Sequence, residues 1–216
     1  MEQRENGFSR RELFARIGIA IGVAVGLPLS MPFRARARAQ AAASEAFISL
    51  TAEEAEILRA IISRIIPADE NGPGALEARA DRFIDRALAG AMKADRPRYR
   101  EGLAALNAHA RNAKGSPLAK LSAADQDALL TDVQQGRASG FSGSSTAFFN
   151  LVRTNTIQGT FADPFYGGNA NFIGWDLIGY PGARIVVTSN LQRIDMKAEP
   201  SRKGAYDYGM FTKGEL

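Results

Sequence analysis

From residue 51 onward, hydrophobic positions along the chain repeat at the spacing of a helix. The stretch after Thr51 is the clearest case, with apolar residues at i, i+3, i+4, i+7 and i+8: Leu58, Ile61, Ile62, Ile65 and Ile66. Thr51 and Glu54 have the spacing of a capping box, in which each side chain satisfies a backbone N–H at the other residue. The pattern predicts a helix that begins after Thr51 and ends at Pro67.

The same periodicity predicts four further helices. They are expected at about residues 76–92, at about 98–113, from Ser122 to the residue before Gly136, and at about 146–158. Gly159 is the expected residue at which the last of them ends. The apolar stripe of each helix is typical of a core face, although a partner-binding face would carry the same pattern.

One strand is indicated, at residues 184–188, and a single short strand does not form a sheet. The expected fold is therefore mainly α. It is a compact bundle of about five helices, followed by a long irregular C-terminal segment that is rich in glycine and aromatic residues.

Residues 161–182 combine glycines with aromatic side chains in a way that suits neither a helix nor a strand. Gly167, Gly168 and Asn169 tolerate positive φ, so the chain can turn sharply and approach another surface closely. A rigid aromatic loop of this kind is typical of a protein–protein anchor, and equally of a loop that packs on the core of its own domain. The predicted partner-binding residues are Asp163, Pro164, Tyr166, Gly167, Gly168, Asn169, Trp175, Tyr180 and Pro181.

Residues 1–39 have the pattern of a secretory leader. The residues of its S-R-R-x-L-F arrangement, which indicates twin-arginine export, are Ser9, Arg10, Arg11, Leu13 and Phe14. An uncharged run over residues 17–33 follows, and it is shorter than the ~20 apolar residues of a membrane span. We expect cleavage after Ala39, whereas the arginines at 34, 36 and 38 leave an uncleaved anchor as the alternative. Residues 40–50 are then an alanine-rich linker, and residues 51–216 form a single helical domain.

The positive charge of the chain is confined to this leader. The whole sequence has 27 basic and 23 acidic residues, and the leader contains seven arginines against three glutamates, so the remainder is neutral. Affinity for nucleic acid depends largely on neutralising phosphates. The charge distribution therefore gives no reason to expect a nucleic-acid partner.

The sequence lacks the usual elements of catalytic and cofactor sites. The absence of cysteine excludes disulfides, iron–sulfur ligation and covalent attachment of a c-type haem. The lone histidine, His109, cannot form a multi-histidine metal site; its helical position indicates a structural role, with a catalytic base as the alternative. No dinucleotide-binding or phosphate-binding glycine motif is present, and the G-F-S-G-S around Ser142 lacks the second glycine of a nucleophile elbow.

Asp163 and Asp176 are the remaining candidates for chemistry, as an acid/base pair. Each also has a simpler explanation. Asp163 precedes a proline where a turn would begin, and Asp176 lies at the start of a predicted short helical turn. We therefore predict no catalytic, cofactor-binding or metal-binding residue in this chain.

Two stretches carry a resemblance to a known family. DPFYGGNANFIGWDLIGYPG, together with the upstream LTAEEAEILRAIISRIIPADENGPGALEARADRFIDRAL, resembles the gluconate 2-dehydrogenase subunit 3 family. These proteins are the small, or gamma, subunits of membrane-associated, flavin-dependent sugar and sugar-acid dehydrogenases. The resemblance extends over essentially the whole chain, including the twin-arginine leader.

The resemblance implies a non-catalytic subunit. In this family the chemistry belongs to a large FAD flavoprotein of the glucose–methanol–choline (GMC) type, and electrons leave through a multihaem c-type cytochrome subunit to quinone. The small subunit is expected to assist maturation and stability of the flavoprotein and to supply its export signal to the twin-arginine translocase. The complex would then lie in the periplasm at the inner membrane, with FAD and haem c in the partner chains and no cofactor in this one.

Other assignments remain open at the level of sequence. A free-standing periplasmic binding or scaffold protein could share the aromatic loop, and a small hydrolase could use Asp163 or Asp176. The substrate of a complex could be gluconate, glucose, fructose, sorbitol or 2-ketogluconate, because the pocket would be on another chain. The sequence also leaves open the stoichiometry, leader cleavage, and whether the aromatic loop is interface or core.

Overall fold

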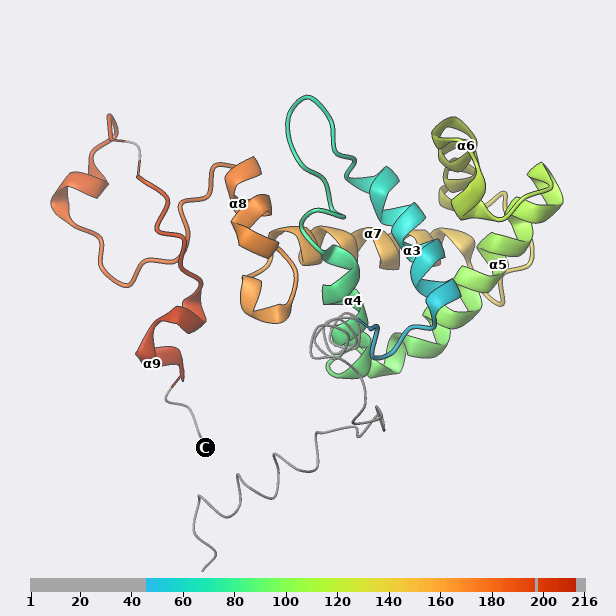
Figure 1. Ribbon diagram of the computed structural model, residues 1–216, viewed down its shortest axis with the longest axis horizontal. Coiled ribbons are helices and arrows are strands. Elements are labelled where there is room, and N and C mark those ends of the chain that lie inside the picture. Colours follow the sequence, from blue (N-terminus) through green and yellow to red (C-terminus); the bar gives the residue numbers. More distant parts are fainter. Residues whose placement is uncertain (1–45, 197, 213–216) are drawn as a thin grey trace, which may run out of the picture. The chain divides into compact units, whose positions relative to one another are not determined.

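The computed structural model describes residues 46–196 and 198–212 (Figure 1). The helices in this part of the chain are α3 (Ala52–Ile65), α4 (Ala80–Ala89), α5 (Arg96–Lys114), α6 (Ala123–Gln134), α7 (Ser145–Phe161), α8 (Ile173–Leu177) and α9 (Gly209–Thr212). Short 3-10 turns connect several of them, and the described residues contain no β-strand. The predicted mainly α fold is confirmed, with α3 to α7 as the five longer helices.

The first of these helices begins as its sequence predicts. The Thr51 hydroxyl accepts a hydrogen bond from the Glu54 N–H at 3.2 Å, and the Glu54 carboxylate accepts one from the Thr51 N–H at 2.8 Å. Leu58, Ile61 and Ile62 are buried, whereas the last two residues of the apolar stripe are half-buried. The capping box and the apolar face thus fix both the start of α3 and the side that it turns to the core.

The core lies where α7 contacts α3, α4, α5 and α6, and α7 runs behind α3 and α4 in Figure 1. Tyr99 of α5 is fully buried, and its hydroxyl accepts a hydrogen bond from the Asn155 amide at 2.8 Å. Burial raises the pKa of Tyr99 well above its ordinary value. Gly102 is one turn along α5, and a Cβ there would lie 2.2 Å from the Phe148 ring. Glycine at 102 therefore lets α7 pack closely against α5.

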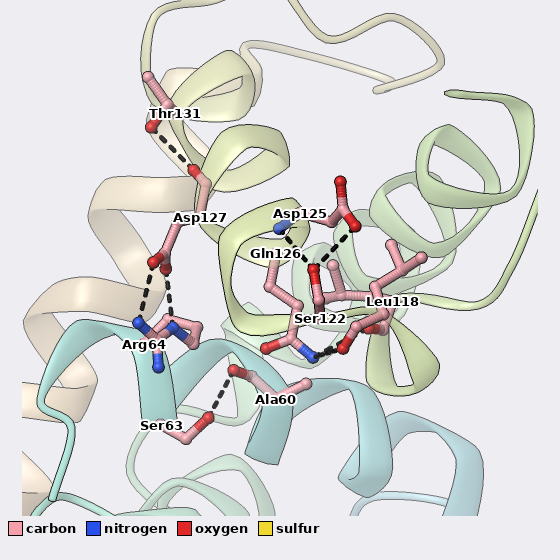
Figure 2. Close-up of polar contacts among 10 residues, drawn as sticks. Ala60, Ser63, Arg64, Leu118, Ser122, Asp125, Gln126, Asp127 and Thr131 are labelled. Atoms are coloured by element: carbon pink, nitrogen blue, oxygen red, sulfur yellow. Dashed lines mark hydrogen bonds and ion pairs between the residues drawn. The ribbon is translucent and has the colours of Figure 1, made fainter. Parts of the chain in front are cut away.

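Polar contacts orient α3 and α6 at the edge of this core (Figure 2). The Arg64 guanidinium donates to both carboxylate oxygens of Asp127, at 2.7 and 2.8 Å. Gln126 is nearly buried, and its amide donates to the carbonyl oxygens of Leu118 and Leu121, which fixes α6 on the turn before it. The Arg64–Asp127 pair is exposed and adds at most about 1 kcal/mol, so packing remains the main source of stability.

The end of the predicted linker is held against α4. Asp85 is 2% exposed, and its carboxylate accepts hydrogen bonds from the backbone N–H groups of Ile48, Ser49 and Leu50 at 2.7 to 2.9 Å. Three donors on one buried carboxylate compensate for its desolvation. The chain therefore approaches α3 along a fixed path.

Two predictions from the sequence were wrong, and the second predicted helix is shorter than expected. Gly159 does not end the fifth helix: α7 continues to Phe161, and a Cβ at 159 would lie 2.9 Å from the Cα of Ala80 in α4. The glycine is there because two helices cross. The strand at 184–188 does not form, because the described chain offers no neighbour with which it could pair. The second helix, α4, begins at Ala80, after turns that include Arg79 at φ 59°.

No helix among the described residues is long and apolar enough to cross a membrane.

Candidate partner-binding site

Residues 161–182, here called the aromatic segment, fold back on the C-terminal half of α7. A Cβ on Gly168 would lie 2.0 Å from the Gly159 carbonyl oxygen, and one on Gly174 would lie 1.8 Å from the Thr160 carbonyl oxygen. No side chain fits at either position. Gly168, which the sequence suggested for close approach, and Gly174 therefore both serve contacts within this chain.

Asn169 holds the centre of the aromatic segment. It is fully buried at φ 45°, and its backbone N–H donates to the Gly159 carbonyl oxygen at 2.8 Å. Its side-chain amide donates to the Ala162 carbonyl oxygen at 2.9 Å, and its side-chain oxygen accepts from the Gly174 N–H at 2.8 Å. One side chain thus joins the end of α7 to the start of α8. The predicted tolerance of positive φ is used here, as it is at Gly167.

Trp175 lies in the interior of the aromatic segment. It is 6% exposed, and its indole N–H donates to the Phe161 carbonyl oxygen at 2.8 Å. Its ring contacts those of Phe172 and Tyr180, with centroids 5.4 and 4.9 Å away. Tyr180 itself is 44% exposed. In this chain Trp175 therefore supports the loop, whereas Tyr180 offers part of its ring to the surface.

The two candidate acids are held by residues of the C-terminal tail, which is described over residues 183–196 and 198–212. One oxygen of Asp163 accepts from the Phe165 N–H at 3.0 Å, and the other accepts from the Ala205 N–H at 2.6 Å. Asp176 accepts from the Arg202 guanidinium at 2.8 Å. Asp163 begins the turn that its position before a proline predicted. The partners of both carboxylates give each a structural role.

Three aromatic rings, two exposed and one half-buried, form a platform beside Asp163. Phe165 stacks on Tyr206 with centroids 3.8 Å apart, and the hydroxyls of Tyr166 and Tyr206 are 2.9 Å apart. The hydrogen bond with Tyr206 raises the pKa of Tyr166 above its ordinary value. Phe165 and Tyr166 are 59% and 47% exposed. Phe165, Tyr166 and Tyr206 are called the aromatic platform below.

The other predicted partner-binding residues shape the backbone around this platform. Pro164 opens the short turn that carries Tyr166, and Gly167 ends that turn at φ 95°. A Cβ at 167 would lie 2.8 Å from the Arg86 side chain, which covers this glycine. The Pro181 carbonyl oxygen accepts from the Ser201 N–H at 2.7 Å. The predicted residues therefore gather in one region, with some on the surface and some beneath it.

Sequence reasoning missed the tail residues that complete this region. Ala205 and Tyr206 meet the aromatic segment across about forty positions of sequence, and Arg202 meets it across 26. No motif or periodicity connects such distant residues. Their contacts become visible only when the tail is folded.

The other candidates for chemistry are not brought together. Ser142 donates to the Glu101 carboxylate at 2.8 Å, and His109 lies on α5 with its Nε2 4.0 Å from Asp132. The His109 side chain is 16% exposed, in agreement with a partly buried helical residue. Among the described residues, no group of three or more His, Asp or Glu side chains could hold a metal ion. The leader residues Ser9, Arg10, Arg11, Leu13 and Phe14 lie outside the described residues.

Large apolar side chains remain exposed mainly at the C-terminal end of the described chain. Of the thirteen exposed ones, only Ile48 and Ile157 lie outside residues 165–211. The others are Phe165, Tyr166, Ile178, Tyr180, Ile185, Val186, Val187, Ile194, Met196, Met210 and Phe211. Concentrated exposure of this kind is typical of a protein–protein or membrane contact. The fold and this surface define a helical domain whose exposed apolar side chains lie mainly in the aromatic segment and the tail.

Comparison with known protein families identifies the group to which this domain belongs. The family model described as gluconate 2-dehydrogenase subunit 3 matches residues 52–182, from the first residue of α3 to the end of the aromatic segment. The match covers well over half of the chain, which therefore belongs to this family of dehydrogenase-complex subunits. No curated protein and no solved structure matches the chain.

Proposed function

We propose that this chain is the non-catalytic small subunit of a periplasmic, membrane-associated, FAD-dependent gluconate or sugar dehydrogenase. The observation that carries the proposal is the family match, which includes α3 to α8 and the whole aromatic segment. The partners are a GMC-type flavoprotein that contains FAD and performs the oxidation, and a multihaem c-type cytochrome that accepts the electrons. The partner flavoprotein determines which sugar or sugar acid is oxidised.

The exposed apolar side chains support a role in binding such a partner. Phe165 in the aromatic platform is 59% exposed, and Val186 in the tail is 68% exposed. Leaving such apolar surface in water costs free energy. Burial against a partner removes that cost, and aromatic residues contribute strongly when they are buried in an interface. The internal contacts of Asn169 and Trp175 hold the aromatic segment in a fixed conformation before a partner binds.

In the proposed sequence of events, the small subunit folds onto the flavoprotein in the cytoplasm, and its leader directs both chains to the twin-arginine translocase. That route carries folded cargo, so a flavoprotein that has already bound FAD can travel with its escort. In the periplasm the small subunit remains in the complex and stabilises the flavoprotein by burying apolar surface.

Replacement of Arg10 and Arg11 by lysine tests the escort role. The expected result is that both this chain and the flavoprotein remain in the cytoplasm, as measured by immunoblotting of fractionated cells. The matched control replaces Arg34 and Arg36 by lysine, which keeps the charge of the leader and lies outside the S-R-R-x-L-F arrangement. A flavoprotein that reaches the periplasm while the Arg10/Arg11 variant stays behind would refute the escort role.

A further inference from the structure

The C-terminal tail presents a loop, residues 185–196, that is closed at its base. The Ala183 N–H donates to the Lys203 carbonyl oxygen at 2.8 Å, and the Ser201 N–H donates to the Pro181 carbonyl oxygen at 2.7 Å. The Tyr208 hydroxyl adds a hydrogen bond to the Ala183 carbonyl oxygen at 2.9 Å. In Figure 1 this loop is the orange stretch between α8 and α9. These hydrogen bonds hold the two ends of the loop together.

The first residues of this loop are apolar and uncovered. Ile185, Val186 and Val187 are 49%, 68% and 54% exposed. Consecutive side chains of a strand point to opposite faces, so a strand formed by these residues would be apolar on both faces. Such a strand is suited to a site where it is covered from both sides.

The backbone of the same residues is also without partners. The N–H and C=O groups of Ile185, Val186 and Val187 form no hydrogen bond within the described part of the chain. β-branched residues such as these strongly favour strands, which is why the sequence indicated one here. The strand-forming sequence is thus present, whereas the described chain supplies no neighbouring strand.

These two features together indicate what would cover the segment. A helix or a flat apolar surface could bury the side chains, but it would leave buried N–H and C=O groups unsatisfied. The edge of a β-sheet that is covered on both faces would bury the side chains and would also pair the N–H and C=O groups that point toward it. A second copy of the segment would give only a two-stranded ribbon, which is marginally stable in water.

We propose that residues 184–188 add as a β-strand to an exposed sheet edge of the flavoprotein subunit, an inference that rests on the proposed function. The contact would lie beyond the family match, which ends at residue 182. It would therefore be a second attachment, separate from the aromatic platform. Arg184 fixes the start of the strand, because its guanidinium donates to the Glu199 carbonyl oxygen at the base of the loop.

Amide hydrogen exchange on the purified complex tests the pairing directly. In the isolated chain the amides of residues 185–188 should exchange rapidly, because they have no acceptor in the described chain. In the complex with the flavoprotein, the amides that pair with the sheet edge should be protected, on the order of a hundredfold or more.

Two substitutions at one position separate backbone pairing from simple apolar contact. Val186→Pro removes the N–H and blocks a ladder, whereas Val186→Ala keeps the N–H and removes most of the apolar side chain. Successive N–H groups of a strand point to opposite edges, so the loss depends on which residue faces the flavoprotein. Val186→Pro should weaken binding to the flavoprotein by about tenfold or more relative to Val186→Ala if the Val186 N–H faces the sheet edge, and Val187→Pro should do so relative to Val187→Ala if the Val187 N–H faces it. The isolated Val186→Pro variant should unfold at the same temperature as the unmodified chain, because Val186 makes no hydrogen bond in it. If that variant misfolds, exchange on the unmodified complex still decides the matter.

Each other outcome contradicts the proposal in a recognisable way. A complex that forms while the amides of 185–188 exchange as in the isolated chain would overturn the strand and leave the proposed function intact. Equal effects of the Pro and Ala substitutions at both Val186 and Val187, without protection, would indicate apolar or membrane contact. Protection in the isolated chain that rises with its concentration would indicate pairing between copies. Failure to isolate any flavoprotein would overturn the proposed function and this inference together.

Discussion

Replacement of Asn169 by alanine is expected to destabilise the aromatic segment more than any exposed substitution there. The change removes a donor from the Ala162 carbonyl oxygen and an acceptor from the Gly174 N–H, which are bonded to Asn169 at 2.9 and 2.8 Å. It also places alanine at φ 45°, which is a left-handed conformation. Because Asn169 is fully buried, water cannot readily replace the lost contacts.

The magnitude follows from these separate losses. Each buried group left unsatisfied costs about 1 to 3 kcal/mol, with the lower end appropriate for the half-buried Ala162. The left-handed conformation adds about 1 kcal/mol for alanine. Asn169→Ala should therefore lower the free energy of unfolding by about 3 to 5 kcal/mol. Asn169→Gly avoids the conformational cost and should lose about 1 kcal/mol less.

Urea denaturation of the purified chain measures this loss. Trp175, the only tryptophan, lies beside Asn169 and reports on the segment by fluorescence, while circular dichroism reports on the helices. Asn171→Ala is the matched control, because Asn171 has φ 56° but an exposed side chain with no hydrogen bond in the described chain. It should cost only about 1 kcal/mol. Equal losses for Asn169→Ala and Asn171→Ala would refute the role assigned to the Asn169 side chain.

Three further substitutions test the packing of the domain and its pH dependence. Gly174→Ala places a Cβ 1.8 Å from the Thr160 carbonyl oxygen and should lower the free energy of unfolding by about 1 to 3 kcal/mol, as measured by thermal unfolding. Gly143→Ala is the control and should change this free energy little, because a Cβ at 143 would have nothing within 4 Å. Trp175→Ala should lower the free energy of unfolding of the isolated chain by about 3 to 5 kcal/mol, because the side chain is buried. If this variant instead lost affinity for the flavoprotein with unchanged stability, Trp175 would be a residue of the interface and not of the core. For Glu54, burial acts to raise the pKa, but hydrogen bonds from the Thr51 backbone and Arg96 lower it overall. The ionised Glu54 side chain therefore contributes stability above its unfolded pKa, and this contribution is lost as pH falls through the lowered folded pKa. Glu54→Gln should reduce the fall in the free energy of unfolding that urea denaturation measures as pH is lowered. An unchanged pH dependence in this variant would contradict the role of the Glu54 carboxylate.

The helices of the bundle could be predicted because their signals are local. The capping box of Thr51 and Glu54 and the apolar stripe after it lie within four turns of one helix. Gly159 shows where local reasoning fails. Glycine commonly follows the last residue of a helix, but here it lies inside α7 because α4 crosses at that point. Only the packing of two distant helices reveals this reason.

The candidate site could be predicted in its location but not in its internal structure. Its turn-forming glycines and asparagine are evident in the sequence, whereas the burial of Trp175 and the hydrogen bonds of Asn169 depend on the end of α7. Tyr206 joins the aromatic platform from forty residues away. The strand predicted at 184–188 needs a neighbour, because strand propensity is realised only by pairing. Contacts between residues far apart in the sequence, or between two chains, leave no local signal in the sequence.

Co-purification shows directly whether this chain is bound to a flavoprotein in the cell. The chain would be tagged at its C-terminus and isolated from the periplasm and membranes of its own cells, and its partners would be identified by flavin absorbance and mass spectrometry. The expected preparation is yellow and contains a GMC-type flavoprotein in near-equal amount. A colourless preparation of this chain alone would contradict the assignment as a dehydrogenase subunit.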